Sequence, residues 1–286
     1  MIFRELTLSE MNPRIPEPAT PCRIRAYLHE DSPEMAGHDA RPVMIVVPGG
    51  AYRFTSDREA DPIALEFLAE GYQVFLLRYS IEPARYPTAL MELCGLIAHI
   101  RANAAEYRVN PAAIAVCGFS AGGHLTASSA TLWKEPVVAE TLGVSARMAR
   151  PDAVILSYPV ITSGEFAHRG SFEFLLGDLA NDPEWLARLS LENRVDADTP
   201  PAFLWHTFHD ELVPVENSLM MAMALRRAGV PFELHIFPDG LHGLSTADHR
   251  SQHDHLPHQI QPAAAQWMGL AKVWLKGLFG VGHAKE

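Results

Sequence analysis

"AAIAVCGFSAGGHLTASSATLW", residues 112–133, carries the clearest structural pattern in this chain. Its first part, 112–119, is a short continuous apolar run, which is typical of a strand buried on both faces of a parallel sheet. Ser120 then stands between two glycines, and residues 121–133 can form the helix that follows. The stretch therefore predicts a buried strand, a tight turn at the serine and a helix.

The same alternation of strand and helix extends along the chain in both directions. Strands are expected at 42–50, 73–80, 112–119, 152–160, 202–208 and 232–238, and helices at 61–72, 86–107, 121–133, 214–229 and 260–278. Residues 3–10 and 22–29 are expected to be antiparallel edge strands. Such alternation predicts an α/β protein with a mostly parallel sheet and helices on both faces.

Residues 161–199 interrupt this alternation. They contain SFEFLLGDLANDPEWLARLS (171–190), which is long for a simple loop and fits a small helical segment better. We therefore expect a single domain over residues 1–286, with a lid-like insertion at about 161–199.

Composition and charge exclude several classes of partner. The 286 residues carry a net charge of −11, which argues against nucleic acid and anionic membranes as partners. No apolar run reaches the ~18 residues of a membrane-spanning helix, and acidic residues stand where a signal peptide would have its apolar core. Cys22, Cys94 and Cys117 lie far apart and are expected to be reduced, which indicates a cytoplasmic protein. The oligomeric state stays open, with a homodimer as one candidate.

Ser120 lies at the carboxyl end of a predicted strand, where parallel sheets form their ligand sites. Gly118 and Gly122 complete the pattern G-x-S-x-G, in which small neighbours permit a strained turn that exposes the serine hydroxyl. The N–H of Ala121 would then lie near a helix N-terminus, where a developing oxyanion is stabilised. The same residues also fit an ordinary turn of small residues, so a nucleophile needs partners elsewhere in the chain.

Two later loops supply those partners. Asp210 follows the strand expected at 202–208, and His242 follows the strand expected at 232–238, so both lie at the same sheet edge as Ser120. The chain order serine, acid, histidine is that of a hydrolase triad on such a sheet. Asp239 is a rival acid and His209 a rival base, but each lies on the same loop as the residue that it would have to pair with.

Further site residues are expected in loops near Ser120. The segment VVPGGAY (46–52) follows a strand, so the backbone N–H groups of Gly49 and Gly50 can bind an oxyanion together with that of Ala121. Tyr52 and Phe119 are expected to form walls of the substrate pocket.

The segments PGGAY (48–52), GFSAGGHL (118–125), HDELVPVENS (209–218) and FPDGLHGL (237–244) together resemble the α/β-hydrolase superfamily. The resemblance is to its small esterases of the acetyl esterase and acetylxylan esterase type, relatives of the hormone-sensitive-lipase group. It implies an α/β-hydrolase fold, Ser120 as nucleophile, Asp210 as acid, His242 as base, and Gly49, Gly50 and Ala121 as oxyanion hole. The lipase-like group usually has a histidine before its glycines. Here Pro48 stands in that place, so this loop must be held differently.

This resemblance implies a serine carboxylic-ester hydrolase that cleaves short acyl esters through an acyl-enzyme, with an acetylated sugar as a candidate substrate and no cofactor. An arylformamidase with the same triad is an alternative, as is a non-catalytic ligand-binding module on the same scaffold. A peptidase is less favoured, because the chain has no room for a propeller-sized gating domain. Six histidines between His235 and His258 lack any HExxH spacing, so we expect a solvated loop and no metal site.

Overall fold

A computed structural model describes the whole chain except residues 19, 33, 35–39, 256–258 and 281–286. Within the described residues, eight strands form one sheet in the order β1-β2-β4-β3-β5-β6-β7-β8. The strands are β1 (Ile2–Leu6), β2 (Arg23–Leu28), β3 (Arg41–Val47), β4 (Gln73–Arg78), β5 (Val109–Phe119), β6 (Ala153–Ser157), β7 (Ala202–Thr207) and β8 (Phe232–Phe237). From β4 to β8 all neighbours are parallel, whereas β1 and β2 are antiparallel. The predicted mostly parallel sheet with two antiparallel strands on one side is confirmed, but the strand expected over 3–10 ends at Leu6 and is followed by a short helix.

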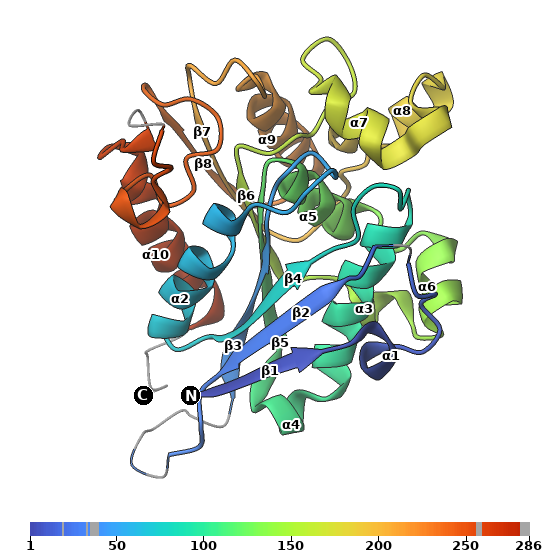
Figure 1. Ribbon diagram of the computed structural model, residues 1–286, viewed down its shortest axis with the longest axis vertical. Coiled ribbons are helices and arrows are strands. Elements are labelled where there is room, and N and C mark those ends of the chain that lie inside the picture. The colour runs from blue at the N-terminus through green and yellow to red at the C-terminus, as the bar shows by residue number, and fades with distance from the viewer. Residues whose placement is uncertain (19, 33, 35–39, 256–258, 281–286) are drawn as a thin grey trace.

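Helices cover both faces of this sheet (Figure 1). The helices α2 (Asp61–Ala69) and α10 (Trp267–Phe279) pack on one face. The helices α3 (Thr88–Ala102), α5 (Ala121–Thr131) and α9 (Glu216–Ala228) pack on the other. The central strands are apolar on both sides because each face is buried under helices.

Shorter helices complete the fold: α1 (Leu8–Met11), α4 (Ala104–Tyr107) and α6 (Pro136–Leu142). The helix expected over 86–107 ends at Ala102, and α4 forms a separate turn after Asn103. The helix α6 was not predicted, because its short run PVVAETL lies between two longer signals. No helix in the described part of the chain is long and apolar enough to span a membrane.

The segment 161–199 is helical, as expected. It contains α7 (Arg169–Leu176) and α8 (Pro183–Arg188), which lie together above the end of the sheet in Figure 1, and the short 3-10 turns η3 (Gly177–Leu179) and η4 (Leu191–Asn193). Asp182 caps α8 by accepting hydrogen bonds from the N–H groups of Glu184 and Trp185. Whether the segment acts as a lid, and whether the chain is one domain, stay predictions.

Candidate active site

Ser120 lies in the turn between β5 and α5, at the carboxyl edge of the sheet. Its backbone has φ 53° and ψ −119°, a conformation that residues with a side chain rarely adopt. Two hydrogen bonds fix this turn: the Ser120 N–H donates to the Ser157 carbonyl at 3.0 Å, and the Val160 N–H donates to the Ser120 carbonyl at 3.1 Å. The turn at Ser120 is therefore braced by the neighbouring strand β6.

The two glycines around this turn are required by the close approach of side-chain and backbone atoms from neighbouring segments. A Cβ on Gly118 would lie 2.1 Å from Thr126 Oγ1, and a Cβ on Gly122 would lie 2.3 Å from the carbonyl oxygens of Val47 and Pro48. Both distances are far inside van der Waals contact. The G-x-S-x-G pattern thus lets the start of α5 press against the loop that follows β3.

The structure brings Ser120, Asp210 and His242 together. His242 Nε2 lies 2.8 Å from Ser120 Oγ, and His242 Nδ1 lies 2.6 Å from Asp210 Oδ2. Both distances are those of hydrogen bonds. Asp239 and His209, the rival acid and base, are exposed. The three side chains form a continuous chain of hydrogen bonds from the carboxylate to the serine hydroxyl.

The Asp210 carboxylate is fully enclosed and well satisfied. Its Oδ1 accepts hydrogen bonds from the N–H groups of Leu212 and Val213, at 3.1 and 2.9 Å. Its Oδ2 lies 3.3 Å from His206 Nε2, a contact that the sequence did not reveal. Burial raises the pKa of Asp210, but the hydrogen bonds from His206 and His242 outweigh burial and hold its pKa below the ordinary value. Asp210 is therefore ionised throughout the neutral range.

Two predicted oxyanion donors have free N–H groups, and one does not. Within the described residues, the amides of Gly50 and Ala121 have no hydrogen-bond acceptor, whereas the Gly49 N–H donates to Glu59 Oε2 at 2.8 Å. The expectation that Gly49 is an oxyanion donor is therefore wrong, because that donor is already used. The structure adds Ala51, whose amide also has no acceptor in the described part of the chain and whose φ of 56° keeps the loop tightly turned.

Known proteins are similar to this chain in sequence and in structure. The BD-FAE family matches residues 32–225 of the chain. The chain belongs to the BD-FAE family. Endo-1,4-beta-xylanase B of Butyrivibrio fibrisolvens is 38% identical to this BD-FAE protein over 232 residues, and the acetylxylan esterase of Xylanibacter ruminicola is 30% identical over 218 residues.

These matches cover 78% and 74% of this BD-FAE chain, but only 34% and 43% of the two relatives, so the chain spans between a third and a half of their length. Among solved structures, an acetyl ester-xyloside bifunctional hydrolase from Caldicellulosiruptor lactoaceticus is 37% identical, with a TM-score of 0.77 over 93% of this chain and 91% of that one. A second, MGS-M1, is an alpha/beta hydrolase enzyme from a Medee basin deep-sea metagenome library and is 34% identical, with a TM-score of 0.77 over 98% of this chain and 99% of that one. Together with the sheet order, these two neighbours confirm the predicted α/β-hydrolase fold.

A pocket of about 670 Å³ opens over Ser120 and His242 in this BD-FAE protein. Its walls include the half-exposed side chains Phe54 and Leu212 and, from the inserted segment, His168. The lining residues are Gly50, Ala51, Phe54, Thr55, Ser56, Asp57, Arg58, Glu59, Ser120, His168, Leu212, His242, Gly243, His253 and Gln259. The pocket is therefore built by the loops after β3, β7 and β8 together with the insertion.

The two predicted pocket walls, Tyr52 and Phe119, are not part of this pocket. Phe119 is wholly buried and packs against Tyr158 and Trp267 beneath the turn. Tyr52 is buried too, and its hydroxyl lies 2.8 Å from His124 Nδ1. Both predictions were wrong, because a place next to Ser120 or the glycine pair in the sequence does not say to which side of the loop a side chain points.

Glu59 is a buried acid that the sequence did not single out. Glu59 lies in the 3-10 turn η1 (Asp57–Glu59). Besides the hydrogen bond from the Gly49 N–H, it accepts a hydrogen bond from the Tyr158 hydroxyl on Oε1 at 2.7 Å. The Tyr158 oxygen in turn accepts the N–H of Ser245 at 2.9 Å, and its ring packs edge-on against His242. Glu59 and Tyr158 therefore connect the glycine loop with the loop that carries the histidine.

Arg58 reinforces this connection from the same turn. Its guanidinium donates to the carbonyls of Gly243 at 2.7 Å and Ser251 at 2.6 Å, and its own carbonyl accepts from the Ser245 hydroxyl at 2.5 Å. No sequence motif marks this interaction, because η1 and the histidine loop are more than 180 residues apart.

The described part of the histidine-rich stretch forms no cluster of metal ligands. Among the described residues, no group of three or more His, Cys, Asp or Glu side chains could hold a metal ion. His258 lies outside the described residues, so the expectation for that position stays a prediction.

Proposed function

We propose that this protein is a serine hydrolase of carboxylic esters in which Ser120 is the nucleophile, His242 the general base and Asp210 the orienting acid. The observation that carries the proposal is the hydrogen-bonded chain Asp210–His242–Ser120 at 2.6 and 2.8 Å. A serine hydroxyl is a weak nucleophile, and a histidine within hydrogen-bonding distance and oriented by a carboxylate is what activates it.

In the first half of the reaction, Ser120 Oγ attacks the ester carbonyl carbon and its proton passes to His242 Nε2. The carbonyl oxygen becomes an oxyanion, which the free N–H groups of Gly50 and Ala121 are suited to bind, with Ala51 as a third donor. The C–O bond to the alcohol then breaks, and the imidazolium gives its proton to the departing alcohol. The acyl group remains on Ser120.

In the second half, His242 takes a proton from water, and the resulting hydroxide attacks the acyl carbonyl. The bond to Ser120 breaks, the serine oxygen regains the proton from His242, and the carboxylic acid leaves. Asp210 stays ionised throughout and keeps the imidazole in the tautomer with its proton on Nδ1.

As substrates we propose short acyl esters, and acetyl groups on sugars in particular. The names of two similar proteins, an acetylxylan esterase and an acetyl ester-xyloside hydrolase, support this choice. A pocket of about 670 Å³ must hold both halves of an ester, which favours a small acyl group when the alcohol is a sugar.

The test is hydrolysis of phenyl acetate by the wild type and by Ser120→Ala. We expect the variant to lose more than about 1,000-fold in kcat, because no other group can form the acyl-enzyme. Ser9→Ala, at an exposed serine far from the pocket, is the matched control and should keep full activity. Retention of most activity by Ser120→Ala would disprove the nucleophile. Comparison of phenyl acetate with N-formylkynurenine separates an esterase from an arylformamidase, and falling rates with longer acyl chains support the small acyl group.

We further propose a cytoplasmic, homodimeric protein of one domain. The three cysteines are free, which is compatible with a reducing compartment. The placement of His168 in the pocket wall supports a lid-like role for the insertion. Size-exclusion chromatography with light scattering tests the dimer.

A further inference from the structure

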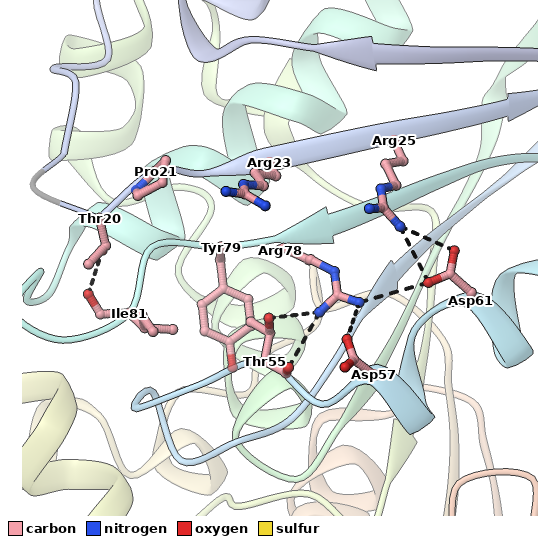
Figure 2. Close-up of a pocket in the computed structure, with 10 residues that line it drawn as sticks. All are labelled: Thr20, Pro21, Arg23, Arg25, Thr55, Asp57, Asp61, Arg78, Tyr79 and Ile81. Carbon is pink, nitrogen blue, oxygen red and sulfur yellow. Dashed lines mark hydrogen bonds and ion pairs between the residues drawn. The ribbon is translucent and has the colours of Figure 1, made fainter.

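A second pocket, of about 480 Å³, lies at the same edge of the sheet, next to the catalytic pocket. Figure 2 shows its side chains, which come from β2, β4, α2 and the loop after β3. We call it the arginine pocket, and it is lined by Thr20, Pro21, Arg23, Arg25, Thr55, Asp57, Asp61, Arg78, Tyr79 and Ile81. Three arginines and two aspartates give this lining a net positive charge, on a chain whose net charge is −11.

Strand pairing brings the three arginines together. Because β2 runs antiparallel to β4, Arg23 at the start of β2 lies directly opposite Arg78 at the end of β4. Arg25 is two residues further along β2 and therefore lies on the same face as Arg23. Like charges directly opposite each other on neighbouring strands destabilise a sheet. An anion bound between them would relieve this repulsion.

The aspartates compensate only part of this charge. Arg78 donates to Asp57 Oδ1 at 2.7 Å and to Thr55 Oγ1 at 3.1 Å. Arg78 also lies 3.8 Å from Asp61 Oδ2. Arg25 lies 3.4 Å from Asp61 Oδ1 and 3.6 Å from Glu5 Oε1, so both arginines have acidic partners. Arg23 is exposed and has no hydrogen bond or ion pair within the described part of the chain, as Figure 2 illustrates for the pocket residues. One guanidinium therefore stands at the pocket with all of its donors available.

The arginine pocket and the catalytic pocket share a wall. Thr55 and Asp57 line both, so the two pockets adjoin at this segment. Because the proposed acyl group is short, only the alcohol part of an ester is long enough to extend that far. An ester that spans both pockets would therefore place part of its alcohol at the arginine pocket.

We propose that the arginine pocket binds a carboxylate on the alcohol part of the substrate, so that acylated sugars bearing an acidic group of the uronic acid type are preferred. The proposal rests on the proposed ester hydrolase function. The planar guanidinium of Arg23 matches a carboxylate with two parallel hydrogen bonds. A phosphate presents similarly paired oxygens, so the experiment includes a sugar phosphate ester to distinguish the two anions.

The decisive experiment compares two esters that differ only in the carboxylate: monoacetylated methyl glucuronide and monoacetylated methyl glucoside. For the wild type we expect kcat/KM to be about tenfold higher for the glucuronide, which is the size of effect of one charge-assisted contact. In Arg23→Gln this preference should fall to about one. Arg226→Gln removes the same charge from an exposed position on α9 and should keep the preference of the wild type.

Equal kcat/KM for the two esters in the wild type, or an unchanged preference in Arg23→Gln, would overturn the proposal while leaving ester hydrolysis intact. A stronger preference for the corresponding sugar phosphate ester would overturn the assignment to a carboxylate.

A binding measurement separates the two proposals. Ser120→Ala is titrated with methyl glucuronide and with methyl glucoside by ligand-observed NMR. We expect the glucuronide to bind about tenfold more tightly, and this difference to disappear when Arg23→Gln is added. If the wild type does not hydrolyse phenyl acetate, the hydrolase proposal fails, and this difference in affinity still decides whether the arginine pocket selects a carboxylate.

Discussion

Glu59 Oε2 accepts a hydrogen bond from the backbone N–H of Gly49 at 2.8 Å, although nothing in the sequence links these two residues. The histidine usual before the glycines in the lipase-like group is Pro48 here, and a proline has no side-chain donor or acceptor. In this chain a buried carboxylate from the turn η1 holds the loop. The oxyanion loop is thus fixed by a residue ten positions further on.

We predict that Glu59→Gln lowers kcat by about 10- to 100-fold and changes KM by less than about threefold, because it displaces donors that act on the transition state more than on bound substrate. A glutamine has one acceptor oxygen, so it cannot serve both the Gly49 N–H and the Tyr158 hydroxyl. Steady-state kinetics with phenyl acetate measure the effect. Glu184→Gln, at an exposed glutamate, is the control.

Tyr158→Phe tests whether Glu59 acts through this network. The double variant should lose less than the product of the two single effects, because both substitutions break the same connection to Ser245. Independent, multiplicative losses would contradict the coupling, as would a Glu59→Gln enzyme within twofold of the wild type.

Asp210→Asn should lower kcat by about 10³- to 10⁴-fold with little change in KM. The N–H groups of Leu212 and Val213 require an oxygen at the Oδ1 position, so the new NH₂ group must face His242 Nδ1. The histidine then carries its proton on Nε2 and cannot accept the proton of Ser120. Asp239→Asn, at an exposed aspartate in the histidine loop, should keep full activity. A loss below tenfold in Asp210→Asn would mean that another group orients His242.

His124 should make the fold less stable in mild acid. Burial lowers its pKa to about 4, and its ring lies between the Tyr52 hydroxyl and the Leu189 carbonyl in the inserted segment. As pH falls, the unfolded chain binds a proton at His124 before the folded chain does. The stabilisation of the fold by neutral His124 is therefore complete above the ordinary histidine pKa of ~6.5 and is lost as pH falls toward 4.

Urea unfolding measures this loss. Between about pH 7.5 and about pH 5 the wild type should lose ~2 kcal/mol more unfolding free energy than His124→Gln, which has no proton to bind at this position. His209→Gln, at an exposed histidine, should behave like the wild type. Parallel pH profiles for the wild type and His124→Gln would refute the assignment.

Gly122→Ala should destabilise the protein by about 1–3 kcal/mol and reduce kcat, because the new Cβ would collide with the carbonyls of Val47 and Pro48 and push the oxyanion loop away from Ser120. Gly277→Ala in α10 is the matched control. Apart from the helix's own backbone and the chain neighbours, no atom of the described residues lies within 4 Å of its new Cβ, so the better helix propensity of alanine should stabilise the protein by about 0.5–1 kcal/mol. Thermal unfolding and phenyl acetate kinetics distinguish the two, and equal stability of both variants would contradict the close packing at Gly122.

Local patterns made three features predictable: the strands, most of the helices, and the proximity of Ser120, Asp210 and His242. Apolar runs mark buried strands, and parallel strands place their carboxyl ends at one edge. Residues that follow β5, β7 and β8 are therefore neighbours wherever the rest of the chain goes.

Tyr52, Phe119 and Gly49 show where such patterns fail. Phe119 was assigned to the pocket because it precedes Ser120 in the chain. Tyr52 and Gly49 were assigned to the pocket and the oxyanion hole because they lie in the glycine loop, 46–52. Tyr52 and Phe119 turn inward, and the Gly49 N–H is already bonded. The direction of a side chain in an irregular loop depends on what packs beneath it, and sequence spacing does not contain that information.

Short stretches of the chain determine the order of strands and helices, the glycine-flanked serine and the order of acid and histidine. The contacts of Glu59 with Gly49 and Tyr158, and the meeting of Arg23 with Arg78, join residues from separate elements. They exist only because strand pairing and loop packing bring these side chains to one edge of the sheet. Hydrogen bonds and charges act over a few ångströms, so only the folded chain selects which of the many polar residues meet.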